Sequence, residues 1–195
     1  MMVRKIAVNV ARLVIAMTFI LSGFVKAVDP LGTQYKIVDY LKAMQLGTFV
    51  PDFLTLTASV LLSAVEFGLG ICMLFAIRRR LVSLLALCMM IPMTALTLWL
   101  AVANPVTDCG CFGDAVTLTN WQTFTKNVVL LGCVAIVRYR PLDMMRFVSK
   151  TNQWIVTNYS MLFIFAVSAW SLYDLPQFDF RPYHVGTNIL KGMEI

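Results

Sequence analysis

The stretch Leu81–Ala103 reads LVSLLALCMMIPMTALTLWLAVA and contains no charged side chain. An apolar run of about 20 residues is long enough to cross the ~30 Å hydrocarbon layer of a membrane as a helix. The rest of the chain has the same character, since 59% of its 195 residues are hydrophobic and only 13% are charged. A soluble domain contains roughly 45–50% apolar and about 25% charged residues. The composition therefore excludes a soluble globular protein and predicts an all-α integral membrane protein.

Five apolar segments are candidates for membrane-spanning helices. The fourth is the weakest, because Lys126 and Asn127 interrupt it. We keep it as a span because, without it, Arg138 and Arg140 would lie on the same side as the acidic loops. The five predicted spans are Ile6–Val28, Phe53–Ile77, Leu81–Ala103, Trp121–Val137 and Trp154–Tyr173.

The charged residues are distributed unevenly around these spans. With five crossings, the basic residues gather on one side, while most acidic residues lie on the other. Cytoplasmic segments are enriched in Lys and Arg, so the pattern predicts a cytoplasmic N-terminus and an extracytoplasmic C-terminus. The net charge of +6 then reflects topology, which argues against nucleic-acid binding. The residues on the predicted cytoplasmic side are Arg4, Lys5, Arg12, Arg78, Arg79, Arg80, Arg138, Arg140, Arg146 and Lys150.

The segment between the first two spans is predicted to contain a short amphipathic helix over residues 35–44. Its apolar residues Ile37, Val38, Leu41 and Met44 recur at helical spacing, and charged residues fall between them. Such a helix is expected to lie on the outer boundary between membrane and water.

Two of the five cysteines lie outside the predicted spans, in the segment Asp108–Asp114, which reads DCGCFGD. The predicted topology exposes this segment to an oxidising compartment, where disulfides persist. A disulfide between Cys109 and Cys111 would close a small, strained ring, and strained exposed disulfides are the labile or catalytic ones. Gly110 and Gly113 give the backbone the freedom that such a turn needs. Cys109 and Cys111 are therefore the candidate catalytic residues.

Other interpretations of this segment remain open. The pattern Thr119–Gln122 predicts a capped helix start whose positive end would favour a thiolate, whereas Asp108 and Asp114 would oppose one. A purely structural disulfide is the first alternative, although so short a ring restricts the unfolded chain very little. Zinc is the weakest alternative, because His184 is the only histidine and four good ligands are hard to assemble. We predict a redox-active pair and no metal site.

Four polar residues in or near the first two spans form a second candidate group. A carboxylate in mid-membrane costs about 2.5–3.5 kcal/mol on insertion scales, so Glu66 requires a partner or a proton. Comparison of depths along the helices predicts that Arg12 pairs with Glu66 and that Lys26 pairs with Asp29. These pairs either fix the order of the helices or, in the case of Glu66, handle a proton.

Three further cysteines, Cys72, Cys88 and Cys133, lie inside predicted spans at similar depths from the cytoplasmic side. This permits a relay of reducing equivalents from the cytoplasm. The alternative is that they act as small buried apolar residues.

The motifs resemble those of a known family. Arg12, the segment Ser22–Pro30 (SGFVKAVDP) and the segment Glu66–Gly70 (EFGLG) resemble the DoxX-like membrane proteins. The following segment Cys109–Asp114 (CGCFGD) is similar to the MauE-like, redox-associated branch. The resemblance covers roughly Ile6–Val137 and implies a four-helix membrane bundle linked to thiol–disulfide chemistry.

The resemblance also implies partners and roles. Cys109 and Cys111 match the family's cysteine motif, and its polar framework is matched by Arg12, Lys26, Asp29 and Glu66. It implies extracytoplasmic thioredoxin-like partners and a bacterial inner (cell) membrane. No resident cofactor is predicted: a quinone is possible but unsupported, because the chain lacks a Cys-x-x-Cys pair at a helix end.

The predicted architecture is a four-helix DoxX-like bundle (residues 1–140), a cytoplasmic connection with a fifth transmembrane helix (141–173), and an extracytoplasmic tail (174–195). The predicted function is exchange of disulfides with a thioredoxin-like partner or an attached domain. A non-catalytic membrane subunit that docks a partner, in part through the Gln177–Tyr183 segment, is the alternative. A carrier centred on Glu66 is the third hypothesis.

Overall fold

All regular structure in the described residues of the computed structural model is helical. The structure describes residues 2–45, 50–104 and 118–174. This confirms the all-α prediction, and the long helices begin and end within four residues of the predicted spans. The elements are α1 (Met2–Val28), α2 (Pro30–Ala43), α3 (Asp52–Leu74), α4 (Arg79–Ala103), α5 (Asn120–Tyr139), η1 (Pro141–Asp143), η2 (Lys150–Asn152) and α6 (Gln153–Tyr173).

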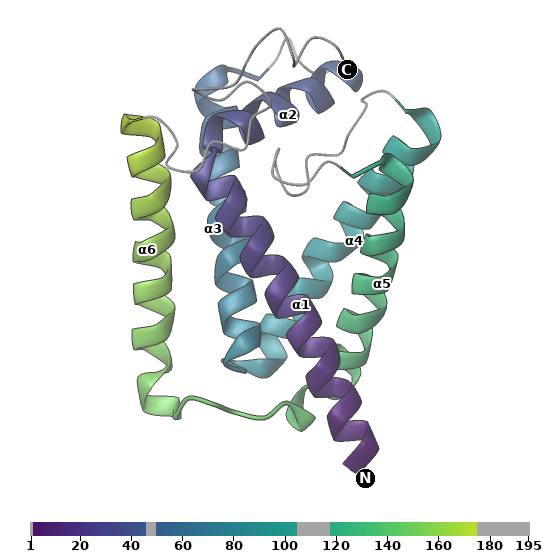
Figure 1. The fold of residues 1–195 in the computed structure, drawn as a ribbon, viewed down its shortest axis with the longest axis vertical. Helices are drawn as coiled ribbons and strands as arrows, with labels where there is room; N and C mark the ends of the chain where they lie inside the picture. The colour runs from purple at the N-terminus through teal and green to yellow at the C-terminus, as the bar shows by residue number, and fades with distance from the viewer. Residues whose placement is uncertain (1, 46–49, 105–117, 175–195) are drawn as a thin grey trace, which may run out of the picture.

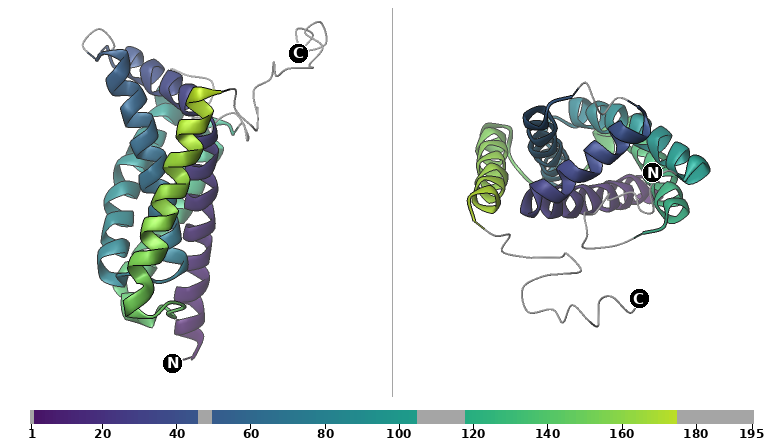
Figure 2. Two further views of the ribbon diagram at one scale, coloured as in Figure 1. Left: turned by 90° about the vertical axis from the view of Figure 1, so that its left-hand side faces the viewer. Right: turned by 90° about the horizontal axis from the view of Figure 1, so that it is seen from above.

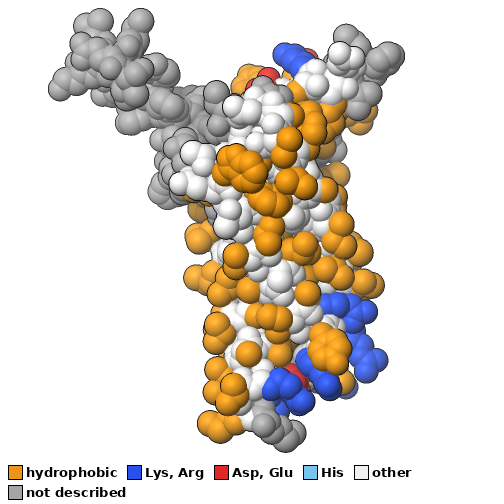
Figure 3. All heavy atoms as spheres, turned by 90° about the vertical axis from the view of Figure 1, so that its right-hand side faces the viewer, with side chains coloured by type: hydrophobic (Ala, Val, Ile, Leu, Met, Phe, Trp, Pro, Cys, Tyr) orange, Lys and Arg blue, Asp and Glu red, His pale blue; other side chains and the backbone are white. Residues whose placement is uncertain are grey.

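The five long helices run side by side and alternate in direction, while α2 lies across one end of the bundle (Figure 1). We call this end the α2 end. The opposite end contains residues 75–80 and 140–152, with the basic side chains seen at the lower right of Figure 3, and we call it the arginine end. Seen from above, α6 lies beside α1 and α3, and α4 and α5 form the other side of the bundle (Figure 2).

Four helical segments are long and apolar enough to cross a membrane, so the chain is a multi-pass membrane protein. They are Met2–Val28, Asp52–Leu74, Arg79–Ala103 and Lys150–Tyr173. The helix α5 is not among them, and its crossing stays a prediction. Its polar Asn127 faces inward, where the side-chain nitrogen donates to Thr97 Oγ1 of α4 at 3.2 Å.

Glycine residues bring α1 and α3 close together. A Cβ atom on Gly23 would lie 2.5 Å from the backbone nitrogen of Phe67 and 2.8 Å from the backbone oxygen of Ser63. A Cβ on Gly70 would lie 2.8 Å from the backbone nitrogen of Ile20. Small residues at such crossings let membrane helices gain packing contacts where lipid offers no hydrophobic drive.

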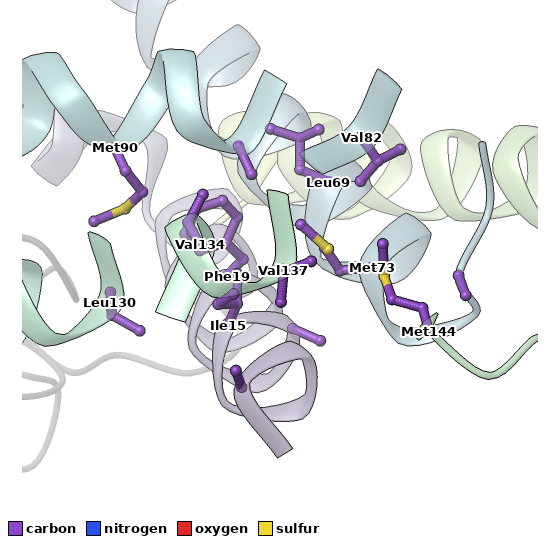
Figure 4. Close-up of a cluster of buried hydrophobic side chains, with 14 of the residues drawn as sticks. Ile15, Phe19, Leu69, Met73, Val82, Met90, Leu130, Val134, Val137 and Met144 are labelled. Carbon is purple, nitrogen blue, oxygen red and sulfur yellow. The ribbon is translucent and has the colours of Figure 1, made fainter. Parts of the chain in front are cut away.

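Apolar side chains from α1, α3, α4 and α5 interlock between the helices (Figure 4). Ile15 and Val134 are fully buried in this core. A second, smaller cluster attaches α6 through Ile164, and Phe163 of α6 stacks on Phe24 of α1 with ring centroids 6.4 Å apart. The core therefore joins the five long helices into one bundle.

The predicted amphipathic helix is present as α2 and is longer than the periodicity indicated. It begins at Pro30, and Asp29 caps it by accepting a hydrogen bond from Gly32 N. Its carbonyl at Pro30 accepts from Ser59 Oγ of α3 at 2.7 Å, and Gln34 donates to the Asp52 carbonyl at 3.1 Å. These bonds fix α2 against the first turns of α3.

The close packing of α1 on α3 predicts opposite effects for two glycine substitutions. Gly23→Ala should lower the free energy of unfolding by about 1–3 kcal/mol, because the new methyl group meets backbone atoms that cannot move aside. Gly132→Ala, where a Cβ would meet no atom within 4 Å other than those of its chain neighbours and its own helix backbone, should be neutral or stabilising by up to about 1 kcal/mol. Thermal unfolding of both variants in detergent tests this, and equal effects would contradict it.

Candidate functional site

A buried ion pair joins α1 to α3. Lys26 Nζ lies 2.6 Å from Glu66 Oε1 and 2.8 Å from Oε2, and both side chains are at most 7% exposed. Ser22 Oγ donates to Glu66 Oε2 at 2.7 Å. Each carboxylate oxygen therefore accepts at least one hydrogen bond, as a buried charge requires. The pair connects two helices through residues that lie 40 positions apart in the sequence.

The predicted pairing of Arg12 with Glu66 is wrong, and helix direction explains why. Side chains tilt toward the N-terminus of their own helix. The helix α1 runs toward the α2 end, so Lys26 tilts down the bundle, whereas α3 runs the other way and Glu66 tilts up to meet it. Arg12 lies fourteen residues, or about 21 Å, further from the α2 end than Lys26 and tilts away from Glu66.

Arg12 instead binds the segment that connects α5 to α6. Its Nη1 donates to the Met145 carbonyl at 2.5 Å, and its guanidinium lies over the Phe147 ring, 5.0 Å from the centroid. Asn9 holds the same segment, since its side chain accepts from Met145 N and donates to the Asp143 carbonyl. Arg4 forms an ion pair with Asp143 at 3.0 Å. One face of α1 thus anchors this connection at the arginine end.

The predicted pairing of Lys26 with Asp29 is also wrong. Asp29 Oδ1 accepts from Gly32 N at 2.9 Å and so serves as the N-cap of α2. A carboxylate at a helix N-terminus satisfies free amide groups and interacts favourably with the helix dipole. The motif Asp29-Pro30 therefore has a local role, which is to begin the surface helix.

A small cavity of about 40 Å³ adjoins the ion pair. It is bounded by Ser22, Lys26 and Glu66 on one side and by Lys126 and Asn127 of α5 on the other. The rest of its lining is mainly apolar, but a cavity of this size can hold a water molecule beside these polar groups. The apolar pattern predicted no site role for Lys126 and Asn127, which only interrupt it. The signal was their shared side of the helix with Thr123 and Leu130, which are buried.

The segment Asp108–Asp114, which contains the candidate catalytic cysteines, lies outside the described residues. Only its flanks are described. Asn104 ends α4, and its side-chain oxygen accepts from Asn120 Nδ2 at 2.8 Å. Thr119 and Gln122 form the predicted capping box at the start of α5. The residues outside the description are Asp108, Cys109, Gly110, Cys111, Gly113 and Asp114.

The three intramembrane cysteines occupy different environments. Cys88 is exposed on α4, whereas Cys72 and Cys133 are partly buried and pack against the main core. All three are free thiols. The electron relay and the alternative role as small apolar residues both stay hypotheses. His184 and the Gln177–Tyr183 segment lie outside the described residues.

The family comparison agrees with the motifs. The family model described as "Methylamine utilisation protein MauE" matches residues 4–140, more than half of the chain, and the protein therefore belongs to the MauE family. The matched range begins within the first turn of α1 and extends to the end of α5. No curated protein and no solved structure matches the chain.

The buried pair predicts a coupled response to substitution. Lys26→Met or Glu66→Met alone should cost about 3–5 kcal/mol, because each leaves an uncompensated buried charge. The double variant should recover most of that loss. Arg4→Met, which breaks the more exposed pair with Asp143, should cost at most about 1 kcal/mol. Thermal unfolding in detergent measures all four, and a double variant as unstable as the sum of the singles would refute the coupling.

Proposed function

We propose that this MauE-family membrane protein exchanges disulfides with an extracytoplasmic thioredoxin-like partner through Cys109-Gly110-Cys111. The observation that carries the proposal is the hydrogen bond between Asn104 and Asn120. It joins Asn104, the first residue after α4, to Asn120, the first residue of α5. The segment between these two residues therefore begins and ends at the same place on the bundle. That point is at the α2 end, opposite the arginine end (Figure 1).

The distribution of charge supports an extracytoplasmic location for this end. The segments at the arginine end contain Arg78–Arg80, Arg138, Arg140, Arg146 and Lys150, and among them Asp143 is the only acidic residue. Such an excess of basic residues is typical of the cytoplasmic side. With that orientation, the α2 end faces the oxidising compartment of a bacterial cell, and we propose the inner membrane as the location.

The chemistry is a two-step exchange between sulfur atoms. One thiolate of the reduced pair attacks the partner's disulfide, and the released partner sulfur takes up a proton. The second cysteine then loses its proton and attacks the mixed disulfide, which frees the partner as a dithiol and leaves Cys109 and Cys111 oxidised. Two electrons and two protons pass to the partner, and the reverse sequence oxidises a partner dithiol.

The described scaffold suits such a segment. The capping box of Thr119 and the bond between Asn104 and Asn120 hold both ends of the segment on packed helices. An active segment that starts and ends on rigid elements loses less ordering entropy when it meets a partner. The start of α5 also brings a positive helix end to the same place, which favours a thiolate.

Several finer features belong to the same proposal. These are the membrane crossing by α5, the division of the chain into residues 1–140, 141–173 and 174–195, and the kinship with DoxX-like proteins. The proposed exchange needs no resident cofactor, because electrons pass directly between sulfur atoms. A quinone is not proposed, since the chain has no Cys-x-x-Cys pair.

Cys109→Ser and Cys111→Ser should each abolish exchange, because a complete cycle needs both sulfur atoms. In intact bacterial cells, a membrane-impermeant alkylating reagent should label reduced Cys109 and Cys111 in the unaltered protein. The thiol-to-disulfide ratio of the partner should shift in both serine variants. Cys88→Ser, a substitution on the exposed face of α4, is the matched control and should change neither readout.

Three other results would each contradict a stated part of the proposal. A partner whose redox state is the same in both serine variants would refute the exchange. If the partner still co-purified with those variants but not with a chain truncated after Asp174, the protein would be a docking subunit. Failure of the impermeant reagent to reach either cysteine would refute the proposed orientation.

A further inference from the structure

A groove of about 580 Å³ opens at the arginine end between α3, α4 and α6. It exists because α6 packs against α1 and α3, which leaves the face of α3 next to α4 uncovered. Its floor and walls are apolar side chains that remain about half exposed, among them Val65 at 48% and Leu85 at 45%. Within a membrane, such a groove is open to lipid from the side.

The mouth of the groove is basic and polar. Arg78 and Lys150 both line it and are exposed. Neither forms an ion pair or a side-chain hydrogen bond with any described residue. Gln153 and Asn158 add hydrogen-bond donors on the α6 side, and Trp154 is 62% exposed beside them. Trp side chains favour the level of the lipid headgroups.

The positive charge continues around α4. Arg78 also lines a second hollow of about 380 Å³, together with Arg79, Arg80 and Arg146. The one acidic residue on the neighbouring segments, Asp143, is already paired with Arg4. The mouth therefore presents several cations, and no carboxylate among the described residues lines it or pairs with Arg78 or Lys150.

We propose that this groove binds an anionic glycerophospholipid. The headgroup phosphate lies between Arg78 and Lys150, and one acyl chain follows the apolar wall of Val65, Leu69 and Leu85. Basic pockets between membrane helices on the cytoplasmic side are suited to anionic headgroups. The basic mouth matches the phosphate of such a lipid, and the apolar wall matches its acyl chain. A neutral apolar molecule would match only the wall, and a soluble anion would match only the mouth.

A bound lipid also completes the packing of α6. In the groove, α6 contributes Trp154, Met161 and three polar residues, whereas the α3 and α4 lining is mainly apolar. An acyl chain between them adds apolar contacts beyond the one that Met161 makes with Gly68. The lipid then acts as a structural ligand that holds α6 on the bundle, independently of any chemistry at Cys109 and Cys111.

The test is native mass spectrometry of the full chain in neutral detergent, with phosphatidylglycerol and phosphatidylethanolamine of identical acyl chains. The protein should retain phosphatidylglycerol preferentially. Arg78→Gln combined with Lys150→Gln should reduce that retention roughly ten- to thirtyfold, since each basic residue contributes about 1 kcal/mol. Lys5→Gln combined with Arg138→Gln removes the same charge at the same end but outside the groove, and should leave retention unchanged.

A second pair of variants tests whether an acyl chain lies along the apolar wall of the groove. Leu85→Trp should fill the groove and reduce retention of phosphatidylglycerol, whereas Leu84→Trp, an equally exposed position that does not line the groove, should not. Equal retention of the two lipids, or equal loss in both charge variants, would overturn the proposal. Displacement of the lipid by millimolar glycerol phosphate would identify a soluble phosphate site instead and would also overturn it.

Discussion

The ion pair between Lys26 and Glu66 is the interaction on which the rest of the bundle depends. A single charge in the membrane interior is costly, so each of these residues requires the other at hydrogen-bond distance. Their bond is possible only in one register of α1 against α3, and Gly23 packs directly on Ser63 and Phe67 in that register. The backbone contact and the charge contact therefore reinforce each other.

The two ends of the bundle are built on different principles. At the α2 end, helix caps and amide contacts organise the turns, through Asp29, Asn104 and Thr119. At the arginine end, long basic side chains bind backbone carbonyls of the connecting segment, as Arg12 does with Met145 and Arg79 with Leu142. The first arrangement fixes the two ends of the segment that contains Cys109 and Cys111, and the second leaves positive charge exposed at the arginine end.

The positions of the helices could be predicted because lipid imposes length and hydropathy on each span separately. The capping box at Thr119 and the apolar spacing of residues 35–44 were equally local signals. The pairing of Arg12 could not be obtained in this way. It depends on the path of residues 140–147, whose backbone carbonyls compete for the guanidinium, and a comparison of depths contains no information about that path.

The amino-acid sequence by itself determined the apolar helices, the side of the bundle on which the basic residues gather, and the family. Each of these depends only on consecutive residues or on short motifs. Only the tertiary structure decided which charges meet. Lys26 and Glu66 tilt toward each other since their helices run in opposite directions, and Asn127 of the least apolar helix is satisfied by Thr97. Side-chain direction across a helix pair is a property of the assembled bundle, and no single segment specifies it.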